Sequence, residues 1–212
     1  MSTGFFLVLE GPEGSGKSTL AAGLVEALTG EAVIPLLVRE PGGTPAAEAL
    51  RSELLDADRS WTAERELLYI ATARADLVER VIRPALAEGR LVISDRYDLS
   101  TRAYQGAGRG LPETHLEWVN RAATGGLTPD LTLVLDLPAE VATGRVDRRA
   151  AGRNRLDRES DEFHQRVAAY YRAATGPGIA HLNADVSPAT MVESALAAIR
   201  RARPGLLPLS RT

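Results

Sequence analysis

Cysteine is absent from the 212-residue chain, and histidine occurs only three times. A chain without cysteine can form neither a disulfide framework nor a thiolate zinc site. Because the histidines are also widely scattered, we expect no structural metal held by the protein alone. The remaining composition is ordinary for a globular protein, with 44% hydrophobic and 25% charged residues. It predicts a single domain, which we place at residues 1–204.

Long hydrophobic segments are also missing. The first apolar run covers residues 5–9, with no basic residue before it and no small-residue cleavage site after it. It therefore resembles neither a signal peptide nor a membrane span. We expect a cytoplasmic protein with no membrane partner.

Neither sign of charge is in large excess, because the formal net charge is -3. Such a chain has no general field that attracts nucleic acid. Arginines do cluster in "GRVDRRAAGRNRLDRES" (144–160), but no aromatic residue is interleaved there for base stacking. A solvated surface explains any single arginine, and nucleic-acid binding ranks below a closing lid at about residues 146–158. In such a lid, guanidinium groups would meet the charge of a transferring phosphoryl group.

Five apolar runs alternate with longer segments of helical spacing. The runs cover residues 5–9, 33–38, 91–94, 131–137 and 178–182. The helical segments are 17–29, 45–56, 62–87, 112–123, 138–150, 159–174 and 188–203. Continuous apolar runs are typical of strands buried on both faces, and the alternation predicts an α/β fold with a parallel sheet between helices. Residues 205–212 show no periodicity and should form an irregular tail.

The segment "GPEGSGKST" (11–19) lies between a predicted strand and a predicted helix and matches a phosphate-binding loop. Glycines let the backbone N–H groups converge on phosphate oxygens, and the helix adds its positive dipole end. Lys17 would reach the β- and γ-phosphates of a nucleotide, and Ser18 would bind Mg²⁺. The alternative is a flexible turn that fits the pattern by chance. The predicted nucleotide-binding residues are Gly11, Pro12, Glu13, Gly14, Ser15, Gly16, Lys17, Ser18 and Thr19.

Several classes of nucleotide-binding protein use such a loop. A switch GTPase would need an Asn-Lys-x-Asp segment, which the chain lacks, whereas a motor or partition ATPase stays possible on the loop alone. The segment 94–110 begins where a predicted strand ends, so Asp95 and Arg96 should face the same crevice as the loop. Asp95 could hold a Mg²⁺ water and Arg96 could clamp a second phosphate group. A surface salt bridge is the plainer interpretation of this pair.

Arg74 lies on the apolar stripe of the long predicted helix 62–87. An unpaired buried charge costs several kcal/mol, so its guanidinium group must find a partner. Helix spacing alone leaves open whether that partner is an internal carboxylate or a ligand anion.

Five segments occur in an order that resembles thymidylate kinase over about residues 5–200. They are "GPEGSGKST", "REPGGT" (39–44), "SDRYDLSTRAYQGAGRG" (94–110), "PDLTLVLD" (129–136) and "NRLDRES" (154–160). The resemblance implies a P-loop nucleoside monophosphate kinase fold with a five-stranded parallel sheet in the order 2-3-1-4-5. It further implies a homodimer that uses ATP and Mg²⁺ to convert dTMP to dTDP for dTTP supply. The arginine-rich lid resembles that of the bacterial subclass.

The resemblance also assigns roles to residues. Glu13 should bind the substrate 3′-hydroxyl, and Tyr104 should disfavour a ribose 2′-hydroxyl. The substrate-binding set is Glu13, Arg51, Ile70, Arg74, Arg96, Thr101, Tyr104 and Gln105, of which Thr101 and Gln105 contact the thymine edge. The catalytic set is Lys17, Asp95, Arg96 and the lid arginines Arg148, Arg149 and Arg153, with Ser18 and Asp95 on the metal. The Glu40–Pro41 bond should be cis.

One position departs from the family. A phenylalanine usually stacks on the thymine four residues before the helix arginine, but this chain has Ile70 there. Tyr69 cannot replace the ring unless the helix carries a bulge, because one residue is about 100° of rotation. A kinase of another, even modified, pyrimidine deoxynucleoside monophosphate therefore stays an alternative. So does a non-catalytic ATP-binding protein.

Overall fold

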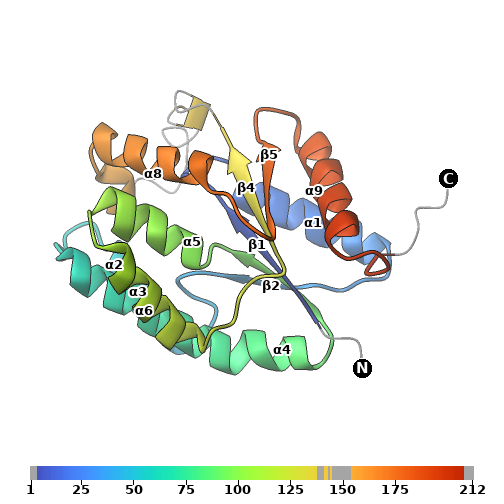
Figure 1. Cartoon of the computed structure of the whole chain (residues 1–212), viewed down its shortest axis with the longest axis horizontal. Helices are drawn as coiled ribbons and strands as arrows, with labels where there is room; N and C mark the ends of the chain where they lie inside the picture. The colour runs from blue at the N-terminus through green and yellow to red at the C-terminus, as the bar shows by residue number, and fades with distance from the viewer. Residues whose placement is uncertain (1–3, 138–140, 143, 145–153, 208–212) are drawn as a thin grey trace.

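The computed structural model describes residues 4–137, 141, 142, 144 and 154–207. Its centre is a five-stranded, all-parallel sheet in the order β2-β3-β1-β4-β5 (Figure 1). The strands are β1 (Phe5–Glu10), β2 (Leu36–Arg39), β3 (Leu91–Asp95), β4 (Leu131–Asp136) and β5 (Ile179–Asn183). Each lies within three residues of a predicted apolar run, so the fold class and strand order expected from the sequence are confirmed.

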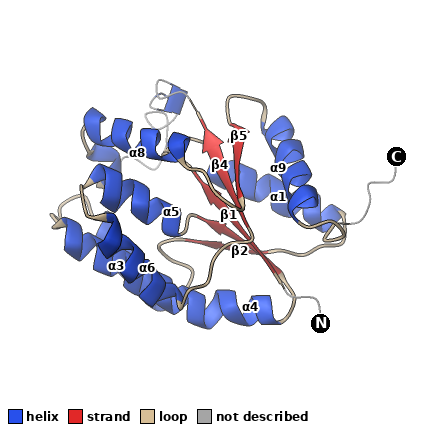
Figure 2. Ribbon diagram, in the orientation of Figure 1, coloured by secondary structure: helices blue, strands red, loops and turns tan. Residues whose placement is uncertain are grey.

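Helices connect the strands and cover both faces of the sheet (Figure 2). They are α1 (Lys17–Gly30), α2 (Pro45–Leu55), α3 (Ala63–Leu77), α4 (Arg83–Ala87), α5 (Asp98–Thr101), α6 (Glu113–Thr124), α8 (Asp161–Ala173) and α9 (Pro188–Ala202). Two π-helical segments, η1 (Val78–Ile82) and η2 (Arg102–Gly108), and a 3₁₀ turn, η3 (Leu156–Arg158), complete them. The predicted helix 138–150 lies almost wholly outside the described residues. None of the described helices has the length and apolarity to cross a membrane.

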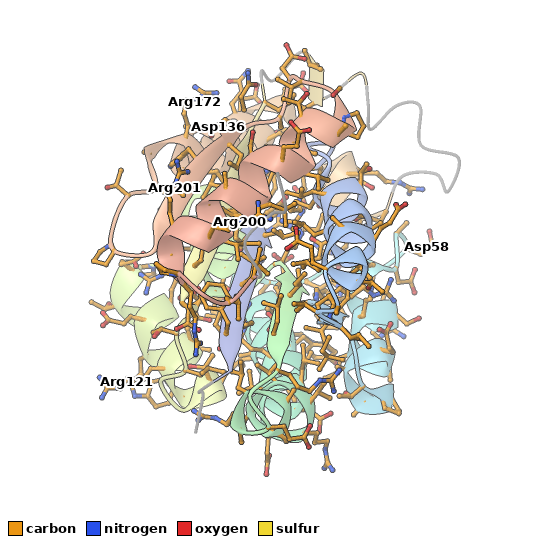
Figure 3. All side chains as sticks on the ribbon, turned by 90° about the vertical axis from the view of Figure 1, so that its right-hand side faces the viewer. Asp58, Arg121, Asp136, Arg172, Arg200 and Arg201 are labelled. Atoms are coloured by element: carbon orange, nitrogen blue, oxygen red, sulfur yellow. The ribbon has the colours of Figure 1, made fainter. Side chains whose placement is uncertain are left out.

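The alternation of β1 side chains separates two apolar layers, as the period of two in a strand requires. Phe5, Leu7 and Leu9 pack with α1 and α9. Phe6 and Val8 point to the other face, against η1 and α4. Charged side chains such as Asp58 and Arg121 project from the surface in Figure 3. The sheet is thus a rigid platform, and its loops carry the polar chemistry.

The carboxyl ends of all five parallel strands lie along one edge of the sheet. The loop after β1 leads into α1, the loop after β2 leads into α2, and the segment after β3 leads into α5. Thr44 caps α2 by accepting a hydrogen bond from Ala47 N at 3.0 Å, with Pro45 at the first helical position. These three connections therefore converge on one place.

Candidate active site

A cavity of about 670 Å³ opens at this edge of the sheet. The predicted loop residues Glu13, Gly14, Gly16, Lys17, Ser18 and Thr19 line it, together with Asp95. The eight predicted substrate-binding residues also line it: Glu13, Arg51, Ile70, Arg74, Arg96, Thr101, Tyr104 and Gln105. These residues come from four separate parts of the chain. The fold thus brings the nucleotide-binding set and the substrate-binding set to one cavity. Gly11, Pro12 and Ser15 of the nucleotide-binding set do not line it.

The loop after β1 curls in a way that glycine permits. Gly16 has a φ of 94°, in the left-handed region, immediately before α1 begins. A Cβ at Gly11 would lie 2.9 Å from the carbonyl oxygen of Leu135, which leaves no room for a side chain. Helix α1 thus starts at Lys17, with its amino end at the cavity.

Lys17 is held by the loop that it belongs to. Its ammonium donates to the carbonyl oxygens of Gly11 at 2.9 Å and Pro12 at 2.8 Å, and to Ser15 Oγ at 3.3 Å. Burial lowers the pKa of Lys17 to about 8, and the charge of Arg96 acts in the same direction. The carboxylates of Glu13 and Asp95 oppose this effect. The ammonium is therefore charged at neutral pH and already positioned.

Ser18 and Asp95 face each other at the mouth of the loop. Ser18 Oγ donates to Asp95 Oδ2 at 3.0 Å, although the two residues are 77 positions apart. A hydroxyl and a carboxylate oxygen are the hard donors that Mg²⁺ prefers, and Mg²⁺ needs only one or two carboxylates beside substrate phosphates. The pair fits the predicted magnesium site.

Within the described residues, the Arg96 side chain donates hydrogen bonds to five partners. Its Nη2 donates to Glu13 Oε1 at 2.6 Å and to Tyr104 Oη at 3.2 Å. Its Nη1 donates to Gly11 O, Ser100 Oγ and Tyr171 Oη at 3.2–3.3 Å.

The backbone of Arg96 has a φ of 78°, a costly conformation for a residue with a side chain. Such strain persists only where the surroundings fix it, and Arg96 N donates to Leu9 O at 2.9 Å. Burial lowers the pKa of Arg96, but Tyr104 and Glu13 outweigh it and raise the pKa well above its ordinary value. The guanidinium group stays charged beside the phosphate loop.

Glu10, which no sequence motif marks, lies at the end of β1 and interacts electrostatically with Arg96. It is fully buried and accepts hydrogen bonds from Tyr97 N at 2.8 Å, Ser100 N at 3.0 Å, Ser100 Oγ at 2.6 Å and Tyr171 Oη at 3.0 Å. Burial raises the pKa of Glu10 more than the charge of Arg96 and these hydrogen bonds lower it. Glu10 thus links the end of β1 to Tyr97 and Ser100 in the segment after β3, which also contains Arg96. The only sequence signal was an acid at the end of an apolar run.

Helix spacing left open whether Arg74 pairs with an internal carboxylate or with a ligand anion. Its Nε donates to the carboxylate of Glu40 at 2.6 Å, so its partner is internal. Burial raises the pKa of Glu40 to about 7 against the lowering effect of Arg74. The remaining contacts of Arg74 are with Thr101 Oγ1 at 2.9 Å, Tyr97 O at 2.8 Å and Asn120 Oδ1. A guanidinium group has five N–H donors, so these four bonds within the described residues leave one.

Ile70 lines the cavity and Tyr69 does not. The Tyr69 ring packs edge-on against Trp61 with centroids 4.4 Å apart, and its hydroxyl donates to Glu53 at 3.3 Å. The π-helical segment η1 begins at Val78, after Arg74, so it does not rotate Tyr69 into the place of Ile70. The position that stacks on the base in the family is aliphatic here.

Other predictions divide between described and undescribed parts of the chain. The Glu40–Pro41 bond is cis, as expected, and Arg51 Nη1 donates to Pro41 O at 2.8 Å. The lid arginines Arg148, Arg149 and Arg153 lie outside the described residues. Further cavity-lining residues were not predicted, because their apolar types carry no functional signal: Leu54, Leu55, Leu156, Ala184, Val186, Pro188 and Met191.

Comparisons with known proteins agree with this geometry. The family model described as thymidylate kinase matches residues 9–194. The chain belongs to the thymidylate kinase family. A thymidylate kinase of Cereibacter sphaeroides is 48% identical over 182 residues, which cover 82% of this chain and 84% of that protein. One of Pseudomonas savastanoi is 44% identical over 97% of this chain and 96% of its own length. One of Thermomicrobium roseum is 49% identical over 80% of each.

Membership of the thymidylate kinase family makes the chain a nucleoside monophosphate kinase, a phosphotransferase with a P-loop. The phosphate loop with Lys17 and a cationic wall formed by Arg51, Arg74 and Arg96 line the same cavity.

Proposed function

We propose that the chain transfers the γ-phosphate of ATP to dTMP in this cavity and releases dTDP. The observation that carries the proposal is the lining of one cavity by both the phosphate loop and the eight predicted acceptor residues. A protein that only bound ATP would have no use for a second cationic wall beside the loop. Because the phosphate loop and Arg96 line the same cavity, an acceptor phosphate bound by Arg96 would lie near the donor phosphates.

Catalysis in this arrangement is mainly positioning and charge stabilisation, as in other phosphoryl transfers. Lys17 and the loop amides hold the donor phosphates, and Arg96 orients the acceptor phosphate. The acceptor oxygen of dTMP is already ionised at neutral pH, so a general base adds little. The transfer is in line and needs no covalent intermediate. Arg148, Arg149 and Arg153 are assigned to the charge that spreads over the transferring group.

Ser18 and Asp95 would hold the magnesium ion of the nucleotide. When bound, the ion neutralises charge on the phosphate oxygens. Asp95 acts here as a magnesium-side carboxylate and not as a proton acceptor. Their 3.0 Å hydrogen bond keeps both oxygens at the mouth of the loop before nucleotide arrives.

The nucleoside part of dTMP is assigned to the other end of the cavity. Four of the five N–H donors of Arg74 are used by described residues. The fifth could donate to a carbonyl oxygen of the base, and Thr101 and Gln105 line the same cavity. Glu13 is assigned to the 3′-hydroxyl. Tyr104 stands between Arg96 and Glu13, with its hydroxyl 3.2 Å and 3.4 Å from them, where it would crowd a 2′-hydroxyl.

Turnover with ATP and a panel of monophosphates tests the assignment. We expect kcat/KM for dTMP to exceed that for dUMP, dCMP, dGMP and dAMP, with dTDP and ADP formed in equal amounts. Preferred turnover of dCMP, or of a modified pyrimidine monophosphate, would replace dTMP as the substrate. ATP binding without turnover of any acceptor would leave a non-catalytic ATP-binding protein.

The Ile70→Phe variant should lower the KM for dTMP by about 5- to 10-fold, because base stacking on an aromatic ring contributes about 1–3 kcal/mol. Ile70 is 9% exposed at the cavity wall, so a ring at this position can meet the base. Ile70→Leu is the matched control and should leave KM within about twofold. A higher KM for dTMP in Ile70→Phe would mean that the base does not lie against this residue.

A homodimer and a cytoplasmic location complete the proposal. Helices α3 and α6 pack side by side and each exposes a large apolar side chain, Leu68 at 57% and Trp118 at 72%. Sedimentation equilibrium should give twice the chain mass of 22.7 kDa. A monomer at micromolar concentration would refute the dimer and leave the catalytic assignment untouched.

A further inference from the structure

Glu66 has no assigned role, and it is the most completely enclosed acid next to the proposed base site. It lies on α3 one turn before Ile70, is 0% exposed and does not line the cavity. In the described part of the chain, three side chains donate to its carboxylate: Gln105 Nε2 at 2.5 Å, Arg155 Nη2 at 2.5 Å and Arg109 Nη2 at 3.0 Å. A buried charge is costly unless it is paired and hydrogen-bonded, and the two arginines supply this pairing for Glu66.

The arginines keep Glu66 ionised. Burial raises its pKa, but the hydrogen bonds from Arg109, Gln105 and Arg155 and the charge of Arg109 outweigh it, so the pKa lies below its ordinary value. An ionised carboxylate accepts hydrogen bonds and donates none. The group that Gln105 turns towards Glu66 must therefore be its NH₂.

The orientation of Gln105 follows from that contact. With Nε2 on Glu66, the carbonyl oxygen Oε1 is the free end of the amide. Gln105 is 1% exposed and lines the cavity, and its Oε1 has no hydrogen-bond partner among the described residues. A buried polar atom without a partner is costly, so a ligand group that reached this oxygen and donated a hydrogen bond to it would be favoured.

Pyrimidines differ at the edge that such an oxygen would meet. Thymine and uracil carry an N–H donor at N3, whereas cytosine has a bare acceptor nitrogen at N3. An amide free to turn could serve either kind of base, since its two ends offer a donor and an acceptor. An amide fixed by Glu66 offers only the acceptor.

We propose that Glu66 is a positioning residue that fixes the Gln105 amide with its carbonyl oxygen towards the nucleobase, and so selects pyrimidines that carry N3–H against cytosine. The inference rests on the proposed function, in which Gln105 contacts the base edge. Arg109 and Arg155 serve the same end, because they hold the carboxylate ionised and in place. The selectivity thus depends on an acid that never touches the substrate.

The Glu66→Gln variant tests this role through the ratio of kcat/KM for dTMP to that for dCMP. Glutamine at 66 has nearly the same shape and offers either a donor or an acceptor to Gln105, so the amide is free to turn. We expect the ratio to fall about 10-fold, the size of a lost hydrogen bond in a site that leaves a polar atom unpaired. The change should appear mainly as a higher KM for dTMP and not as a lower kcat.

A second background separates positioning from a general structural effect. In a Gln105→Met protein the ratio should already be reduced, and adding Glu66→Gln should change it by less than about twofold, because Glu66 acts through residue 105. Glu159→Gln is the matched control: Glu159 pairs with Arg109 at 2.6 Å and with Arg155 at 3.9 Å, whereas the described hydrogen bond of Gln105 is with Glu66. It should leave the ratio unchanged.

Failure of this inference can be told apart from failure of the proposed function. An unchanged ratio in folded Glu66→Gln, or an equal fall in the Gln105→Met background, overturns the inference. If Glu66→Gln does not fold, Glu66→Asp keeps the charge but shortens its reach to Gln105, and it must lower the ratio in the same way. A wild-type protein that does not phosphorylate dTMP would instead refute the proposed function, whatever the variants do.

Discussion

The Arg96→Ala variant should lose about 10³-fold in kcat/KM for dTMP while its affinity for ATP changes little. The guanidinium group of Arg96 is buried, charged and fixed by Glu13 at 2.6 Å, so it is already positioned at the cavity. Removing one preorganised donor from a transition state typically costs 10²–10³-fold, and arginines on transferring phosphoryl groups contribute 10³–10⁵-fold. The loss should appear in kcat as well as in KM, because positioning fails in both states.

Arg102→Ala is the control for this experiment. Arg102 lies six residues further on, pairs with Glu113 on α6 and does not line the cavity. Steady-state rates and ATP affinity by calorimetry should match those of the wild type. If Arg96→Ala keeps its dTMP turnover, or loses ATP binding to the same extent, Arg96 does not belong to the acceptor side.

The Lys17→Met variant should lose at least about 10³-fold in kcat. The Lys17 ammonium is already held by Gly11 O, Pro12 O and Ser15 Oγ, and these bonds keep it at the loop where donor phosphates would lie. Methionine keeps most of the side-chain volume and removes the charge. Single-turnover rates at saturating ATP measure the loss, and a kcat within 10-fold of the wild type would show that the phosphates bind elsewhere.

The charge of Lys17 can also be followed directly, because it is the only lysine in the chain. Isotope labelling of lysine gives one side-chain signal, which should titrate near pH 8 in the empty protein. Bound triphosphate favours the ammonium and raises this pKa. ATP affinity should therefore fall as the pH rises above 8, since binding then requires proton uptake. An unshifted signal near pH 10.5 would contradict the burial of the ammonium.

Local patterns predicted most of the framework. The strand, glycine-rich loop and helix from Phe5 to Gly30 each carry their signal within a few residues, and the structure places them as expected. The long helix 62–87 was predicted as one element, whereas the structure divides it into α3, η1 and α4. A π-helical turn changes hydrogen bonding without changing residue types, so composition does not reveal it.

Contacts between distant parts of the chain were beyond local reasoning. Glu10 reaches Tyr171 across 161 positions and Glu66 reaches Arg155 across 89, and no short pattern marks such pairs. Segment η2 was missed as a helix because its glycines lower helix propensity. Leu116 and Phe163 pack so closely on Gly106 and Gly108 that larger residues would clash. Tertiary packing, which local sequence patterns do not record, therefore determines the conformation of η2.

Arg74 was predicted in part from the sequence. Its place on an apolar stripe predicted a buried charge that needs a partner, and the structure supplies Glu40 from the loop after β2. The choice between an internal and an external partner depends on a residue 34 positions away. Helix spacing predicted that Arg74 is buried, but only the folded structure shows that Glu40 is its partner.

A crystal structure with dTMP, Mg²⁺ and a non-hydrolysable ATP analogue tests the central claim most directly. We expect the β- and γ-phosphates on Lys17 and the loop amides, and the dTMP phosphate on Arg96, with its oxygen in line with the γ-phosphorus. The thymine N3–H should donate to Gln105 Oε1. A dTMP phosphate bound away from Arg96, or on the far side of the loop from the γ-phosphate, would contradict it.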